Sequence, residues 1–154
     1  MNASTQPPVI ESAPLLALTV ACHGDWMAQV SEALSALAHP PAWGAQQRYF
    51  VELVLEELIL NAGTHGRPLA ASACIEARLW QAGELALIEV VDDGAPFDPG
   101  QASDPDLEAP LAQRQLGGLG LYLVRQLCDG LHHERRDRRN HVWVWRRDRP
   151  EGPA

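Results

Sequence analysis

The pattern of apolar and polar residues divides the chain into short strands and helices. Apolar or alternating runs predict strands over residues 15–22, 72–81, 85–91, 131–138 and 141–147. Helical spacing of apolar residues predicts helices from 26 to about 38, from 42 or 44 to 64, and from 117 to about 128. Since this order is β-α-α-β-β-loop-α-β-β, we expect an α/β (α+β) two-layer sandwich. All helices would lie on one face of a mostly antiparallel, mixed sheet.

Caps and chain breakers set the ends of these elements. Asp25 is expected to cap the first helix, and Gly66 with Pro68 to end the second. The last two strands are expected to form a hairpin that turns at Arg139 and Asn140.

The same pattern predicts one folded domain over residues 15–147. Residues 1–14 are polar and contain prolines, which predicts a flexible leader, and residues 148–154 are expected to form a tail. Residues 95–116 are rich in Pro, Gly, Asp and Ala and carry no helix or strand pattern. Because long unstructured loops in compact domains are often functional, we expect a lid there.

Composition narrows the class of protein. The chain has 154 residues, 20 acidic and 12 basic, and a formal net charge of -8, which argues against a general nucleic-acid or anionic-membrane binder. All the basic residues are Arg, which excludes lysine chemistry. Cys22, Cys74 and Cys128 lie in apolar contexts without metal-ligand spacing, and we expect free thiols. Without an apolar run of membrane-spanning length, the expected location is the cytoplasm.

The stretch 52–66 (ELVLEELILNAGTHG) carries the strongest chemical signal. Glu57, Asn61 and His65 are spaced four apart, so in a helix they form a polar stripe on one face. The remaining circumference is largely apolar and is expected to be buried, which favours a cleft beside the stripe. The alternative is that Glu57 and Asn61 only cap or pair with a neighbouring element.

A second stretch, 90–99 (VVDDGAPFDP), places a carboxylate where a strand ends. Asp92 there can accept a hydrogen bond from an exocyclic amine, and Gly94 allows close backbone approach. The alternative is an ordinary Asp-Gly turn followed by a proline-containing loop.

A third stretch, 116–127 (LGGLGLYLVRQL), places glycines just before a helix. Such glycines let backbone N–H groups at the positive end of the helix approach a phosphate. The alternative is a tight turn with close helix packing. Neither a Walker A sequence nor a dinucleotide-binding fingerprint fits the glycine spacing.

Taken together, the three stretches are more specific than any one of them. Their order, E-x-x-x-N-A-x-x-H-G, then D-x-G-x-P-F-D, then G-G-x-G-L-x-L-V, resembles the GHKL (Bergerat-fold) ATP-binding superfamily. The residues of each motif are most similar to those of the anti-sigma-factor serine/threonine kinase branch. The resemblance runs from residue 15 to about residue 147.

The resemblance implies a role for each matching residue. Glu57 matches the general base, whereas Glu56 is rotated about 100° away from it. Asn61 matches the Mg²⁺ ligand and Asp92 the carboxylate that recognises adenine. Gly94 matches the glycine that makes room for the adenine ring. Gly117, Gly118 and Gly120 match the turn at the phosphates, with Leu121 behind it, and His65 matches a position with a supportive role. From its position alone, Arg114 is also expected near the phosphates.

The resemblance also implies a function. We expect a kinase that uses ATP and Mg²⁺ to phosphorylate a STAS-type anti-sigma-factor antagonist, that sequesters a sigma factor, and that forms a homodimer. Two alternatives stay open: a regulator that binds its partner without phosphotransfer, and a stand-alone histidine-kinase-like ATPase module. The acidic lid residues are expected to face solvent or a partner: Asp98, Asp104, Asp106 and Glu108.

Overall fold

The sheet of this computed structural model has five strands. The structure describes residues 6–21, 25–37, 41–65, 74–110 and 118–149, without the side chains of Ala21 and His65. The strands are β1 (Leu16–Ala21), β2 (Cys74–Ala82), β3 (Leu85–Asp92), β4 (Gly130–Arg136) and β5 (Arg139–Arg147), in the order β1-β2-β3-β5-β4. Every pairing among the described strands is antiparallel, so the sheet is antiparallel there rather than mixed.

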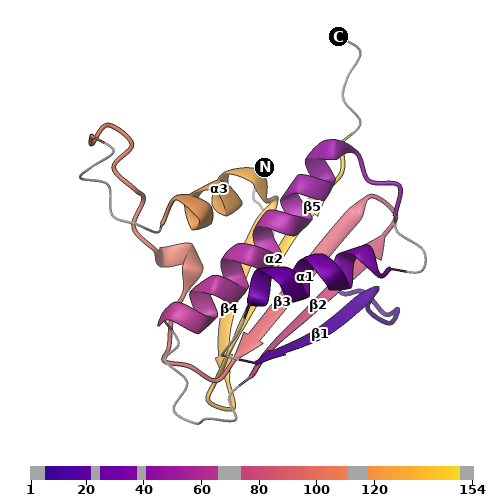
Figure 1. Cartoon of the computed structure of the whole chain (residues 1–154), viewed down its shortest axis with the longest axis horizontal. Coiled ribbons are helices and arrows are strands. Elements are labelled where there is room, and N and C mark those ends of the chain that lie inside the picture. Colours follow the sequence, from indigo (N-terminus) through magenta and orange to yellow (C-terminus); the bar gives the residue numbers. More distant parts are fainter. Residues whose placement is uncertain (1–5, 22–24, 38–40, 66–73, 111–117, 150–154) are drawn as a thin grey trace.

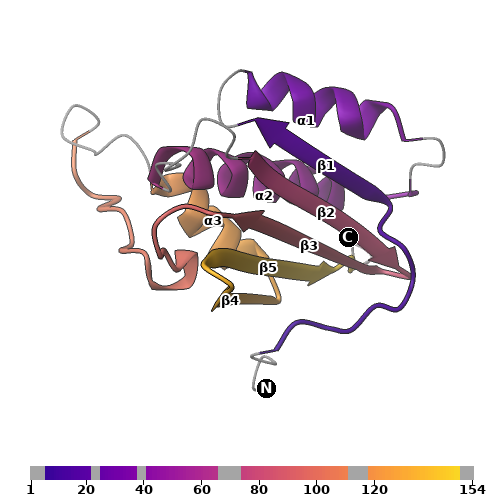
Figure 2. The same cartoon turned by 90° about the horizontal axis from the view of Figure 1, so that it is seen from below.

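The helices cover one face of this sheet, as the sequence predicts. They are α1 (Trp26–Ser35), α2 (Ala45–His65) and α3 (Leu119–Leu127), with a short 3₁₀ helix, η1 (Pro99–Gln101), in the predicted lid. Figures 1 and 2 show α2 along the middle of the sheet, with α1 on one side of it and α3 on the other. The two-layer sandwich is therefore confirmed. Among the described helices, none is both long enough and apolar enough to cross a membrane.

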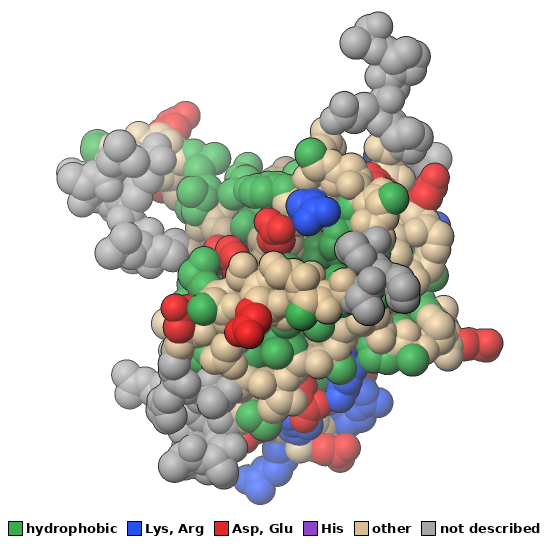
Figure 3. Space-filling model, turned by 45° about the vertical axis from the view of Figure 1, so that its right-hand side comes forward, with side chains coloured by type: hydrophobic (Ala, Val, Ile, Leu, Met, Phe, Trp, Pro, Cys, Tyr) green, Lys and Arg blue, Asp and Glu red, His purple; other side chains and the backbone are tan. Residues whose placement is uncertain are grey.

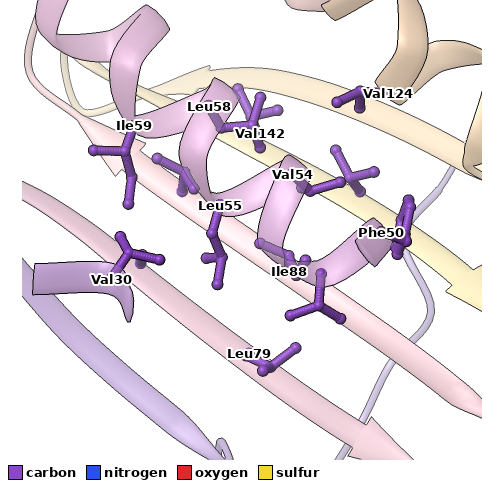
Figure 4. Close-up of a cluster of buried hydrophobic side chains, with 14 of the residues drawn as sticks. Val30, Phe50, Val54, Leu55, Leu58, Ile59, Leu79, Ile88, Val124 and Val142 are labelled. Carbon is purple, nitrogen blue, oxygen red and sulfur yellow. The ribbon is translucent and has the colours of Figure 1, made fainter. Parts of the chain in front are cut away.

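The core lies between α2 and the sheet. Alternation along β2 turns Ile75, Ala77 and Leu79 toward the helices, and the strand register places Ile88 and Val144 on the same face. Figure 4 shows side chains of α2 directed at these strands. They are Phe50, Val54, Leu55, Leu58 and Ile59, each at most 2% exposed. This burial fixes the rotation of α2, and with it the direction in which its polar stripe faces.

The opposite face of the sheet carries a smaller apolar cluster. Leu85, Leu87 and Trp145 are buried there, and Ile10 packs against them. Figure 2 shows the segment before β1 passing along this side of the sheet. Strand β3 is consequently buried on both faces over its whole length.

Two details of the predicted elements can be compared directly. Asp25 caps α1 as predicted, since its Oδ1 accepts a hydrogen bond from the backbone N–H of Ala28 at 3.0 Å. The predicted hairpin turn at Arg139 and Asn140 is wrong, because both residues lie in β5. The turn is made by Asp137 and Arg138, whose φ angles are 52° and 64°. A two-residue turn with positive φ at both positions matches the twist of the flanking strands.

Candidate active site

A cleft opens between α2, the adjacent ends of β3 and β5, and the beginning of the lid. Two of its polar lining residues, Asn61 and Asp92, come from the first and second stretches singled out in the sequence. The third, Asn140, comes from β5. The full lining comprises Leu58, Asn61, Ala62, Val90, Asp92, Ala95, Phe97, Pro99, Asn140 and Val142. Its lining, mostly apolar with a few converging polar groups, has the composition of a small-molecule site, and its volume is about 20 Å³.

Asp92 presents one oxygen to the protein and leaves the other available. Its side chain is 8% exposed, and its Oδ1 accepts hydrogen bonds from the backbone N–H of Gly94 at 2.9 Å and from Asn140 Nδ2 at 3.1 Å. Within the part of the chain that the structure describes, no donor reaches Oδ2. A carboxylate fixed in this way can accept a hydrogen bond from an exocyclic amine of a bound base. Asp93, the next residue, is exposed.

Asn140 holds several parts of this site together. It is 2% exposed and lies directly opposite Asp92 in the β3–β5 ladder. Its Nδ2 also donates to the carbonyl of Ala95 at 2.8 Å, and its Oδ1 accepts from Arg135 Nη1 at 3.1 Å and from the N–H of Phe97 at 3.4 Å. The same guanidinium nitrogen of Arg135 donates to the carbonyl of Gly94 at 2.9 Å. The first lid residues are thus bonded to the strand beneath them.

Sequence reasoning missed Asn140 as a site residue because it was assigned to the hairpin turn. A usable signal was present. Asn140, Val142 and Val144 alternate along β5, so Asn140 continues the inward-facing positions of an otherwise apolar strand face. A polar residue at such a position must find partners.

Glu57 lies against the first turn of α3. A Cβ on Gly120 would overlap the Glu57 carboxylate, so only glycine fits there without displacing the acid. Burial, and next the nearby charge of Glu56, raise the pKa of Glu57 above its ordinary value of 4.5. Among the described residues, no group donates a hydrogen bond to this carboxylate. A half-buried carboxylate with a raised pKa and a free lone pair is suited to accept a proton.

Asn61 follows Glu57 by one helical turn and lines the cleft. Its amide oxygen is a ligand type that Mg²⁺ accepts, and Glu57 supplies a carboxylate on the same face of α2. The described residues contain no group of three or more His, Cys, Asp or Glu that could hold a metal ion. Asn61 and Glu57 would leave the other ligand positions of such an ion to phosphate oxygens and water.

Gly118 forms the turn that starts α3. Its φ of 92° lies in the left-handed region, and it caps the helix without a side chain. Backbone N–H groups at this positive helix end are suited to an anion. Leu121 behind the turn is 7% exposed and belongs to the core cluster. Gly117, Arg114 and the side chain of His65 lie outside the described residues.

The lid's acidic residues have local partners. Asp98 accepts a hydrogen bond from the N–H of Gly100 at 2.8 Å, and Asp106 accepts from the N–H of Glu108 at 3.0 Å. Asp104 pairs with Arg125 of α3 at 2.6 Å. Three of the four acidic side chains in this part of the lid are thus bonded to the chain around them.

The chain is similar to known proteins over most of its length. The model of a family described as histidine kinase-like ATPase domain matches residues 24–145. The serine/threonine-protein kinase BtrW of Bordetella bronchiseptica (strain ATCC BAA-588 / NCTC 13252 / RB50) is 32% identical to this chain over 118 residues. That match covers 77% of this chain and 83% of the relative.

Proposed function

This chain belongs to the histidine kinase-like ATPase domain family, and we propose that it is an ATP-dependent serine/threonine protein kinase of the anti-sigma-factor type. The likeness to a serine/threonine-protein kinase supports the choice of acceptor. The proposed location is the cytoplasm.

The observation that carries the proposal is that Asp92 and Asn61 line one cleft, with Glu57 one helical turn before Asn61 on α2. Asp92, held by Asn140, supplies an acceptor for the adenine amine at one end. Glu57 and Asn61 lie on α2, and the glycine turn of α3 packs against Glu57. A nucleotide whose base reaches Asp92 would direct its phosphates toward the turn and the two α2 side chains. Asn61 would hold Mg²⁺, which neutralises charge on the phosphates when it is bound.

In the proposed reaction, Glu57 accepts the proton of a Ser or Thr hydroxyl on the partner. The hydroxyl oxygen forms a bond to the γ-phosphorus as the bond between that phosphorus and the β–γ bridging oxygen breaks. ADP leaves with the electron pair of the broken bond. The raised pKa of Glu57 brings it nearer to neutral pH, where a general base is most effective.

The proposed partner is a small STAS-type antagonist protein, with a sigma factor as the protein sequestered. Both come from the resemblance to the anti-sigma-factor kinase branch, and a homodimer is proposed on the same ground. Once the antagonist is phosphorylated, the chain would sequester the sigma factor, and ATP would in this way be coupled to transcription.

The test begins with calorimetric titration of the full chain with ATP, with and without Mg²⁺. Micromolar binding that depends on Mg²⁺ is expected, and no binding at millimolar ATP would overturn the proposal. The chain is then incubated with γ-labelled ATP and purified STAS-domain proteins from the same genome. An acid-stable label on a STAS protein supports Ser/Thr transfer, whereas an acid-labile label would indicate transfer to His. Tight ATP binding without any label would favour the non-catalytic regulator.

A further inference from the structure

The beginning of the lid is fixed to α3 by one side chain, Arg125. Its Nη1 donates a hydrogen bond to the carbonyl of Pro99 at 2.9 Å, and its Nη2 pairs with the carboxylate of Asp104 at 2.6 Å. One guanidinium therefore holds two points of the lid that lie five residues apart. Its planar fork of donors makes such a two-point contact, which a lysine ammonium reproduces poorly.

The two contacts differ in their exposure to solvent. The Arg125 side chain is 16% exposed, whereas that of Asp104 is 70% exposed. The bond to Pro99 is thus shielded, and Pro99 itself is buried. The bond to Asp104 faces water and is screened by salt. The hydrogen bond to Pro99, the inner contact, is therefore the stronger of the two. The ion pair with Asp104, the outer contact, can open first.

The lid has two parts, a base at residues 97–102 that packs against the domain and an arm at residues 103–110. Phe97 and Ala102 pack against the core, and a Cβ on Gly100 would lie 3.2 Å from the Leu131 side chain. Beyond Ala102, residues 103–110 extend away from the body of the domain, as Figures 1 and 3 show. Leu107 on this arm is 46% exposed. Arg125 therefore acts at the point where the arm leaves the base.

Arg125 also connects a residue that lines the cleft, Pro99, to the helix that lies against Glu57. Pro99 lines the cleft beside Asp92, and α3 begins at the glycine turn that packs against Glu57. A shift of Pro99 relative to α3 would change the distance between the base-binding end and the phosphate-binding end. The guanidinium opposes that shift through its hydrogen bond to the Pro99 carbonyl.

We infer that Arg125 is a positioning residue that holds the lid base against α3 and so slows the release of nucleotide. This inference rests on the proposed function for the identity of the ligand. Its pair with Asp104 adds an outer contact that is sensitive to salt, and opening of that contact frees the arm before the base moves.

The test is a stopped-flow measurement of the release of a fluorescent ADP analogue. Arg125→Gln should speed release about tenfold, the loss expected for a shielded charge-assisted hydrogen bond. Asp104→Asn should speed it about threefold, as an exposed ion pair would. Arg125→Lys should fall between Arg125→Gln and the unchanged chain. Arg149→Gln, which breaks the exposed Arg149–Asp129 ion pair at the far end of β5, is the matched control and should leave release unchanged.

Two further measurements separate a positioning role from general stabilisation: the effect of the double variant and the dependence of the release rate on salt. Asp104→Asn should have no further effect in the Arg125→Gln background, and added salt should speed release less in Asp104→Asn than in the unchanged chain. A lower Tm for Arg125→Gln with an unchanged release rate would overturn the inference.

Amide hydrogen exchange in the nucleotide-free chain tests whether Arg125 holds the lid, independently of the proposed function. Arg125→Gln should speed exchange in residues 98–104 selectively, and unchanged exchange there would overturn the inference. Absence of ADP binding by the unchanged chain would instead overturn the proposed function.

Discussion

Asn140 Nδ2 donates to Asp92 Oδ1 at 3.1 Å, across the antiparallel ladder between β5 and β3. This hydrogen bond and the one from the Gly94 N–H both go to Oδ1, and no donor among the described residues reaches Oδ2. Asp92 is therefore oriented before any ligand arrives, and a group held in place loses less freedom on binding.

Asn140→Ala should weaken ATP binding about tenfold, since it removes one hydrogen bond that orients Asp92. It also leaves the carbonyl of Ala95 without this donor, and the free energy of unfolding should fall by about 1–3 kcal/mol. Calorimetry and urea unfolding measure the two effects. An unchanged Kd would show that Asp92 keeps its orientation without Asn140.

Asp92→Asn should weaken ATP binding by about tenfold or more, because the acceptor for the adenine amine becomes partly a donor. Asp93→Asn is the matched control, as the neighbouring carboxylate is exposed. Calorimetry should give a weaker ATP affinity for Asp92→Asn than for Asp93→Asn. Equal affinities would remove Asp92 from the base-binding end of the cleft.

Glu57→Gln should keep nucleotide binding and lower the rate of phosphotransfer by about 10²-fold or more, as loss of a general base does. In the unchanged chain the rate should rise with pH through the raised pKa of Glu57. Glu56→Gln should retain transfer and move this rise to lower pH, because the Glu56 charge contributes to the raised pKa. A pH–rate profile that is the same in Glu56→Gln would count against Glu57 as the base.

Glu57 should also make stability depend on pH. Its folded pKa is raised, so its contribution is fully present below the ordinary pKa of 4.5 and is lost as pH rises through the folded value. Glu57→Gln should therefore raise the Tm at pH 7, with the gain disappearing below pH 4.5. Thermal unfolding across this range measures it. A gain that is the same at every pH would point to packing rather than charge.

Gly120→Ala should abolish transfer while the fold survives. The added methyl overlaps the Glu57 carboxylate, which can rotate away, and alanine favours the helix by up to about 1 kcal/mol over glycine. Circular dichroism and the transfer assay test the two parts. Gly83→Ala is a useful contrast: its positive φ of 58° in the β2–β3 turn should cost about 1 kcal/mol or more, with normal transfer. Full transfer by Gly120→Ala would show that Glu57 need not occupy its present place.

Local periodicity predicts the secondary structure that carries three of the candidate site residues. Glu57 and Asn61 follow from helical spacing, and Asp92 from its place at the end of a strand, so all three lie where the pattern predicts. The sandwich follows from the order of the elements in the same way.

The parts that sequence reasoning missed depend on contacts between distant segments. The sequence predicts a turn at Asn140 because no glycine marks the real turn at Asp137 and Arg138. The contact of Arg125 with Pro99 and Asp104 joins residues more than twenty positions apart, and no local period encodes it. The fit of Gly120 against Glu57 likewise exists only once α3 has packed on α2.

The pairing of β3 with β5 has a consequence for how this domain can diverge. These neighbours in the sheet are separated in the chain by residues 93–138, so the sheet is closed around an insertion that includes the lid. Closing a longer loop costs little, about 0.6 kcal/mol for each doubling of a flexible segment. The arm at 103–110 can therefore gain or lose residues while the ladder stays in register. Relatives with the same sheet are free to carry arms of different length without redesign of the core.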